Sequence, residues 1–162
     1  MTRCEEITDG VRTYFDTSLL LKTYLAEAGT EKALEILRKE NPPAPFSHLL
    51  ELELRNAIRI KHGRGESSAV TTRGALQALE SDLARGVLSR PDYDLDFVYR
   101  RAEALSAKHA SGTLARAADI WHVAAALEIG CQAFASFDDR QRKVAALAGL
   151  ELLPAKLPKK KY

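Results

Sequence analysis

The stretch RTYFDTSLLLKTYL, residues 12–25, passes from strand-forming side chains into a leucine-rich segment within a few residues. Residues 13–15 are β-branched or aromatic and favour a strand. Thr17 and Ser18 are good N-caps for the helix that the leucines indicate. The stretch therefore predicts a strand, a tight turn and a helix, with Asp16 at the carboxyl end of the strand.

The remainder of the chain continues this alternation of short apolar strands with longer amphipathic helices, which is typical of an α/β fold. Further helices are expected at about residues 30–40, 48–60, 69–85, 94–110, 113–129 and 140–148. Further extended segments are expected at residues 44–47, 131–136 and 151–153. Asp16 and Asp138 each follow a predicted strand. Open α/β sheets bind ligands beyond the carboxyl ends of their strands, so both acids are candidate site residues.

The composition is that of a globular protein from a reducing compartment. The chain has 162 residues, of which 46% are hydrophobic, and this length can bury a core without disulfides. Cys4 and Cys131 lie far apart without a CxxC motif, which argues against a disulfide framework and a zinc cluster. No apolar run approaches the roughly 20 residues of a membrane span, and the first residues do not form a signal peptide. We expect a cytoplasmic protein with no membrane partner, one domain over residues 1–153 and a Pro/Lys-rich tail over 154–162.

The net charge of +2 is due to that tail. Without its four lysines, residues 1–153 hold 20 basic and 22 acidic side chains. A protein that binds nucleic acid through charge alone needs a basic body. Binding of nucleic acid would therefore depend on a metal ion or a local patch, such as the basic stretch within residues 55–64, which is equally consistent with a solvated helix face.

Two glutamates in the helix expected after residue 47 have different surroundings. At about 100° per residue, Glu53 falls inside the apolar arc formed by Leu50 and Leu54. Glu51 falls on the polar side, where it is spaced to pair with Arg55. A carboxylate on an apolar face is unfavourable without a partner, so Glu53 is the stronger site candidate.

Asp119 shows the same anomaly in the helix expected at residues 113–129. It shares an inward stripe with Val123 and Ala126. A salt bridge with Arg116 is the structural explanation. His122 lies on the same face, where a structural hydrogen bond, metal ligation and an orienting role all remain open.

Four acids, Asp16, Glu53, Asp119 and Asp138, would therefore meet at one edge of the sheet. Unit charges about 4 Å apart repel by roughly 4 kcal/mol at an effective dielectric near 20, so their pKa values are expected to be raised when no cation is bound. A divalent cation removes this conflict, and an oxygen-only ligand set favours Mg²⁺ or Mn²⁺ over zinc. Such a site points to hydrolysis of a phosphodiester. An aspartyl-phosphate phosphatase would need a second Asp where Ser18 stands.

Four segments carry a resemblance to a known family: Tyr14–Lys22, Ser47–Arg55, Ala118–Leu127 and Ala135–Gln141. They resemble the motifs of PIN-domain proteins, and specifically of the VapC-type toxins of toxin–antitoxin pairs. Together with Ala148–Leu150, which follows the fourth segment, they span roughly residues 12–153. The resemblance implies a three-layer α/β/α sandwich with a central parallel sheet, and a Mg²⁺- or Mn²⁺-dependent endoribonuclease. It also implies an RNA substrate, a homodimer and a cognate antitoxin protein.

Carried over by residue, the resemblance makes Asp16, Glu53, Asp119 and Asp138 the catalytic and metal-binding set. It selects Glu53 over Glu51, in agreement with the helix faces. The fourth acid is either Asp138 or its neighbour, and Asp138 is preferred because the family's acid follows a Thr/Ser-x pair, here residues 136–137. Two alternatives to a toxin stay open: a housekeeping PIN nuclease of RNA processing, and a catalytically idle PIN-like module that binds RNA or protein.

Overall fold

The protein alternates strands with helices, as the sequence predicts, in the computed structural model, which describes residues 12–157. The helices in this range are α1 (Thr17–Tyr24), α2 (Thr30–Arg38), α3 (His48–Gly63), α4 (Ala69–Ala84), α5 (Leu95–Thr113), α6 (Ala117–Glu128) and α7 (Asp139–Leu147). The strands are β1 (Thr13–Phe15), β2 (Ala44–Pro45), β3 (Leu88–Ser89), β4 (Ala133–Ala135) and β5 (Glu151–Leu153). Residues 1–11, which include Cys4, and the lysines at 159–161 lie outside the described range.

The central sheet is parallel and brings two distant parts of the chain together. Its strand order is β1-β4-β5, with Thr13 beside Ala133 and Ala133 beside Glu151. Strands β1 and β4 are buried along their whole length, as is usual for strands covered on both faces. Strands β2 and β3 form a second parallel pair, and β2 packs against β1. The carboxyl ends of β1 and β4, and hence Asp16 and Asp138, therefore lie at the same edge.

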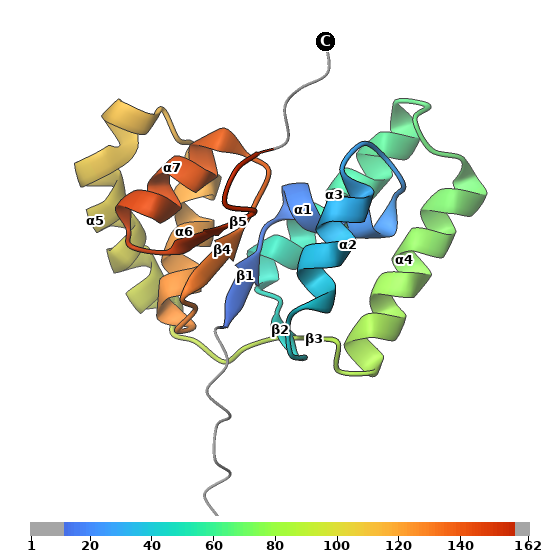
Figure 1. Cartoon of the computed structure of the whole chain (residues 1–162), viewed down its shortest axis with the longest axis horizontal. Coiled ribbons are helices and arrows are strands. Elements are labelled where there is room, and N and C mark those ends of the chain that lie inside the picture. The colour runs from blue at the N-terminus through green and yellow to red at the C-terminus, as the bar shows by residue number, and fades with distance from the viewer. Residues whose placement is uncertain (1–11, 158–162) are drawn as a thin grey trace, which may run out of the picture.

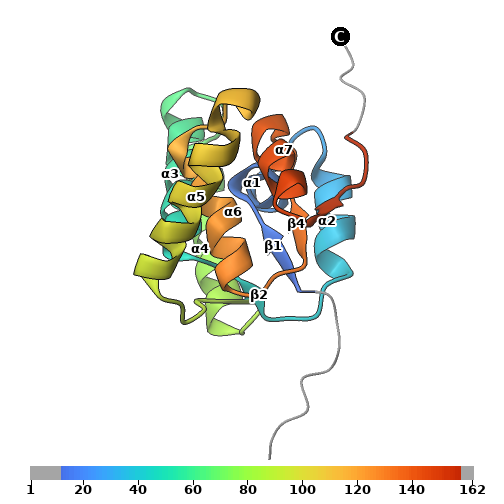
Figure 2. The same ribbon diagram turned by 90° about the vertical axis from the view of Figure 1, so that its left-hand side faces the viewer.

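Helices enclose the sheet on both faces. Figure 1 shows α1–α4 on one side of β1 along the long axis of the molecule and α5–α7 on the other. In the view turned by 90°, α3, α5 and α6 lie on one side of β1 and β4, and α2 lies on the opposite side (Figure 2). The expected three-layer α/β/α architecture with a central parallel sheet is confirmed.

Two details differ from the expectation. Strand β3 was not predicted, because two residues carry too little pattern to mark a strand. The helix expected at residues 113–129 begins only at Ala117, because α5 continues to Thr113 and Leu114 then adopts a left-handed conformation with φ of 55°. This turn places Asp119 in the first turn of α6, where its side chain can cap the helix.

The first residues of the expected tail pack against the domain. The buried Arg142 donates hydrogen bonds to the carbonyl oxygens of Pro154 at 2.8 Å and Ala155 at 3.3 Å. The same guanidinium reaches the carbonyl oxygen of Ser136, directly after β4, at 3.0 Å. Arg142 thus ties the end of β5 to the edge of the sheet where the acids lie. No helix within residues 12–157 is long and apolar enough to cross a membrane.

Candidate active site

Asp16 is completely buried at the junction of β1 and α1. Its carboxylate caps α1 by accepting a hydrogen bond from the backbone N–H of Leu19 at 3.0 Å. The hydroxyls of Ser18 and Ser136 donate to the same carboxylate at 2.8 and 2.7 Å. All of these donors are neutral, and no ion pair to Asp16 occurs within residues 12–157. Burial raises the pKa of Asp16 from 3.8 to about 6, despite these hydrogen bonds.

Asp138 is joined to Asp16 through a shared partner. The Ser136 hydroxyl, which donates to Asp16, accepts a hydrogen bond from the Asp138 backbone N–H at 2.9 Å. The Asp138 carboxylate caps α7 by accepting from the N–H groups of Arg140 and Gln141 at 2.9 and 3.0 Å. Strand ends and helix starts therefore fix both of these acids.

Asp119 is 2% exposed, and its two oxygens have different partners. Its Oδ2 accepts from the backbone N–H of Arg116 at 2.8 Å and from the Arg116 Nε at 3.3 Å. Its Oδ1 accepts from the side-chain amide of Gln141 at 3.3 Å, and the backbone of Gln141 binds Asp138. The salt bridge that the sequence left open is therefore present. Arg116 also lies within electrostatic range of Asp138 and Glu53, and the three acids raise its pKa.

Glu53 projects from α3 toward the same region. Its Oε2 accepts hydrogen bonds from the Thr17 hydroxyl at 2.8 Å and from His122 Nε2 at 2.6 Å. Thr17 directly follows Asp16, and His122 lies one turn after Asp119. The hydrogen bond from His122 lowers the pKa of Glu53 and outweighs the opposite effect of partial burial.

His122 is fully buried and continues into a hydrogen-bonded chain. Its Nδ1 lies 2.8 Å from the Tyr14 hydroxyl, which lies 2.7 Å from the hydroxyl of Ser47, the N-cap of α3. Burial raises the pKa of Tyr14 well above its usual range. Of the roles left open for His122, the structure shows a hydrogen bond to a candidate site residue.

The structure thus links Asp16, Asp138 and Asp119 by shared partners, and Glu53 binds Thr17 and His122, which neighbour Asp16 and Asp119 in the chain. The expectation of uniformly raised pKa values is wrong. The pKa of Asp16 rises because of burial, and that of Glu53 falls because of His122. The error came from treating the acids as unpaired. Hydroxyls, helix N-termini, Arg116 and His122 already stabilise the negative charges.

Glu51 and Asp139, the acids next to Glu53 and Asp138 in the sequence, make no hydrogen bonds to the site residues among those described. Glu51 forms ion pairs with Arg55 and Arg90, both at 2.8 Å or closer, which confirms its predicted pairing with Arg55. Asp139 is exposed to solvent.

The donor set fits a hydrated divalent cation, although no group of three or more His, Cys, Asp and Glu side chains within residues 12–157 is already arranged to hold a metal. Asp16 has only neutral partners among these residues. The side-chain oxygen of Gln141, whose amide binds Asp119, is buried and has no hydrogen-bond partner in the described chain. Carboxylates and an uncommitted amide oxygen suit Mg²⁺ or Mn²⁺, which retain several water ligands.

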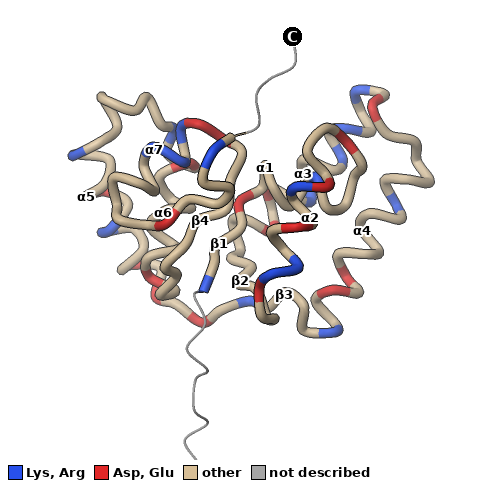
Figure 3. The backbone as a smooth tube through the Cα atoms, in the orientation of Figure 1, with Lys and Arg blue, Asp and Glu red and all other residues tan. Residues whose placement is uncertain are grey.

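The basic stretch in α3 is mostly engaged. Arg55 pairs with Glu51 and Glu80, and Lys61 pairs with Glu27 and Glu66. Arg59 and Arg64 remain exposed. Lys and Arg positions are spread over the helices rather than gathered in a stripe (Figure 3).

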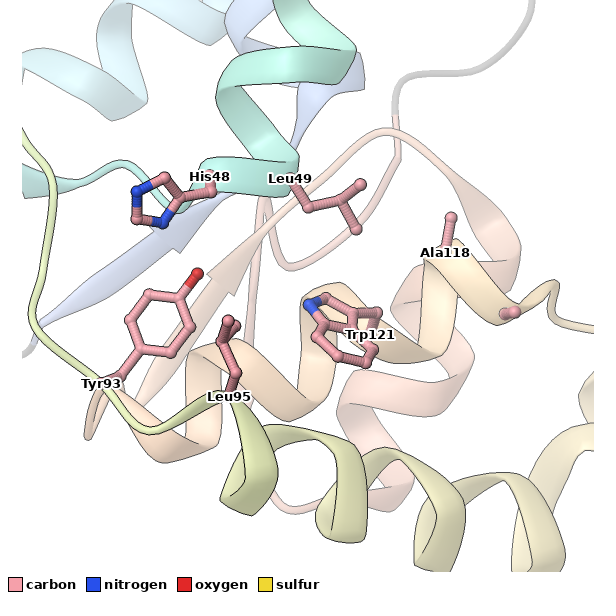
Figure 4. Close-up of a pocket in the computed structure, with 7 residues that line it drawn as sticks. His48, Leu49, Tyr93, Leu95, Ala118 and Trp121 are labelled. Atoms are coloured by element: carbon pink, nitrogen blue, oxygen red, sulfur yellow. The ribbon is translucent and has the colours of Figure 1, made fainter.

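An apolar hollow of about 410 Å³ lies where the first turns of α3 and α6 face the loop before α5. His48, Leu49, Tyr93 and Leu95 line it together with Trp121, whose ring faces Leu49 (Figure 4). The Trp121 side chain is partly buried and packs against the core.

The sequence did not identify several polar residues that bind the acids or, in the case of Tyr14, bind His122. Ser18, Thr17 and Tyr14 lie within two residues of Asp16, but hydroxyl residues in a strand–helix turn also serve as ordinary caps. Gln141 carried a clearer signal, since it is a buried amide three residues after Asp138. A search for polar residues on inward faces near the acids would have found it.

Comparisons with known proteins place this arrangement in a family. A comparison with curated proteins gives no match. The fold is similar to that of VapC20 from Mycobacterium tuberculosis, described as a Sarcin-Ricin loop cleaving toxin, with 16% sequence identity and a TM-score of 0.63. The alignment covers 86% of this chain and 97% of that one. The family model of the PIN domain matches residues 13–147. The four segments that suggested this fold all lie within the match, and the chain belongs to the PIN-domain family.

Proposed function

We propose that the protein is a Mg²⁺- or Mn²⁺-dependent endoribonuclease that acts as the toxin of a toxin–antitoxin pair. The main support is the arrangement of four acids from four separate segments. Asp16, Asp119 and Asp138 share hydrogen-bond partners at one sheet edge, and Glu53 binds Thr17, the residue after Asp16. The likeness to VapC20 gives the fold, and that protein's description as a Sarcin-Ricin loop cleaving toxin adds a precedent for the activity.

The residues divide the work of phosphodiester hydrolysis. A bound divalent cation would activate a water molecule and neutralise charge on the leaving oxygen. Asp16, Asp119 and Asp138 would hold that cation by their carboxylates, and Glu53 would complete the set from α3. Arg116 has a side chain that is 69% exposed beside these acids. Its guanidinium would offset their negative charge toward an approaching phosphate.

Cleavage of RNA by the purified protein is expected to depend on Mg²⁺ or Mn²⁺ and to stop in EDTA. The physical reason is that a phosphate cannot approach four carboxylates unless a cation neutralises them. The measurement is gel analysis of a labelled RNA with added metal, with EDTA, and with EDTA followed by excess Mg²⁺. Full activity in EDTA would contradict the metal requirement, and RNA binding without cleavage in Mg²⁺ would favour the idle module.

The partners we propose are a second copy of the chain and a cognate antitoxin in the cytoplasm. Leu95, Phe97 and Tyr99 at the start of α5 are each more than half exposed, and Leu95 borders the apolar hollow. Exposed apolar groups that adjoin a hollow are typical of protein-binding surfaces.

Light scattering of the purified protein is expected to give the mass of two chains. Phe97→Asp is expected to shift the measured mass toward that of one chain, because it places a charge among these apolar groups. A wild-type monomer at high concentration would count against the homodimer.

A further inference from the structure

Glu53 is held asymmetrically. Both of its hydrogen bonds, from Thr17 and from His122, reach Oε2, and Oε1 receives none from residues 12–157. The Glu53 side chain is 31% exposed, whereas the His122 side chain is 1% exposed. One oxygen is therefore anchored to the protein interior, and the other is left available to a ligand.

The hydrogen bonds that join Glu53, His122, Tyr14 and Ser47 can be donated in one direction only. A carboxylate only accepts, so His122 Nε2 must carry a hydrogen toward Glu53. If Nδ1 is unprotonated, it accepts from the Tyr14 hydroxyl, which in turn accepts from Ser47. Ser47 Oγ then accepts from the Leu50 N–H at 3.3 Å. Every group in this chain from Leu50 to Glu53 then has a partner.

Donation in the opposite direction, from His122 Nδ1 to Tyr14, leaves the hydroxyl hydrogen of Ser47 without an acceptor within residues 12–157. If Nδ1 also carried a hydrogen, Tyr14 would accept from His122 and donate to Ser47. The Ser47 hydrogen would then have no acceptor among the described residues, although Ser47 is fully buried. An unmade hydrogen bond in the interior is unfavourable. Because Glu53 can only accept, the ring of His122 carries a hydrogen on Nε2, and in the neutral ring Nδ1 is then the acceptor for the Tyr14 hydroxyl.

We propose that His122, fixed in this tautomer by Tyr14 and Ser47, is a positioning residue that locks Glu53 Oε2 and thereby presents Oε1 as a single ligand to the divalent cation. This inference rests on the proposed metal-dependent function. It assigns His122 no contact with the cation or the RNA. Donors that orient a ligating carboxylate typically contribute ten- to a hundredfold to metal affinity or activity.

The test measures Mn²⁺ affinity without RNA, by calorimetry or by the electron paramagnetic resonance of free Mn²⁺. His122→Leu, which removes the donor, is expected to weaken binding by about ten- to a hundredfold. His122→Gln retains an N–H near the position of Nε2 and is expected to recover most of the affinity. Tyr14→Phe is expected to give an intermediate loss of Mn²⁺ affinity, because the His122 ring loses its hydrogen bond at Nδ1 but keeps the one to Glu53.

Tyr24→Phe is the matched control for Tyr14→Phe. The Tyr24 hydroxyl also donates a hydrogen bond to a protein group, Asp82 Oδ2 at 2.7 Å, but Tyr24 is the last residue of α1, at the opposite end of the helix from Asp16. It is expected to leave Mn²⁺ affinity unchanged. Nitrogen NMR of the metal-free wild type is expected to show His122 with its hydrogen on Nε2, and this measurement needs no activity.

Three results would overturn the proposal. The first is a folded His122→Leu protein that binds Mn²⁺ as tightly as wild type. If the wild-type protein still shows metal-dependent cleavage, the proposed function stands and only the role of His122 is wrong. The second is an Nδ1–H tautomer in the metal-free protein. The third is a wild type that binds no Mn²⁺, which would overturn the metal-dependent function as well. A wild-type protein that binds Mn²⁺ but cleaves no RNA would contradict the nuclease function alone. The Mn²⁺ affinities of the variants would still decide the role of His122.

Discussion

Glu53→Gln is expected to lower RNA cleavage by about a hundredfold or more, since even the outer partners of metal ligands contribute about ten- to a hundredfold. The amide oxygen of Gln can replace Oε2 and accept from Thr17 and His122, which places the NH₂ group where Oε1 was. An NH₂ group cannot bind a cation. The fold should persist, because both donors, including the buried His122, keep their acceptor. Single-turnover cleavage rates and thermal melts of the same preparations measure the two effects.

Glu51→Gln is the matched control for this change, with the same substitution two residues earlier in α3. Glu51 pairs with Arg55 and Arg90 and has no hydrogen bond to the site residues among those described. Its loss is expected to lower the free energy of unfolding by about 1 kcal/mol or less and to leave cleavage unchanged. A larger loss of cleavage in Glu51→Gln than in Glu53→Gln would show that the metal site lies on the other face of α3.

The sequence was sufficient for the architecture because the strands and helices carry different periodicities. The run from residue 12 to residue 25 predicts β1 and α1 in their correct order, because strand formers give way to leucines. The N-cap was assigned wrongly: it is Asp16, and Thr17 and Ser18 already belong to α1. The start of α6 was missed by four residues. Leu114 has no property that marks it for a left-handed turn, and only the capping of Arg116 by Asp119 fixes the boundary.

For the site, the sequence could identify the acids but not their electrostatics. The regular rotation of about 100° per residue places Glu53 on the apolar face of the helix and Glu51 on the polar face, so these two acids can be distinguished from the sequence. The pKa values depend on partners far away in the chain, such as His122 for Glu53, 69 residues later, and Ser136 for Asp16, 120 residues later. No local pattern specifies these pairs. Asp16 meets Ser136 only when the sheet brings β1 beside β4, and Glu53 meets His122 only when the folded chain brings α3 to α6.

Asp16 gives the clearest pH dependence of stability. Burial raises its pKa from 3.8 to about 6 in the folded protein. The folded state therefore holds this proton more tightly than the unfolded state. The stabilisation from protonated Asp16 is fully present below about pH 4 and is lost as the pH rises through about 6. Each pKa unit corresponds to about 1.4 kcal/mol, so ionised Asp16 lowers the free energy of unfolding by about 3 kcal/mol at pH 7.

Asp16→Asn removes this charge while nearly keeping the shape, and its amide oxygen can still cap α1 through the N–H of Leu19. Urea unfolding in EDTA is expected to show wild type losing about 3 kcal/mol relative to the variant between pH 4 and pH 7. The comparison is made as a difference because the other carboxylates titrate alike in both proteins. Mg²⁺ at pH 7 is expected to restore wild type and to leave the variant unchanged, because a cation that binds only the folded state stabilises it by mass action. A difference that stays constant from pH 4 to pH 7 would mean that Asp16 is hydrated or paired in solution, and the buried, cation-free carboxylate would then be the wrong description of the site.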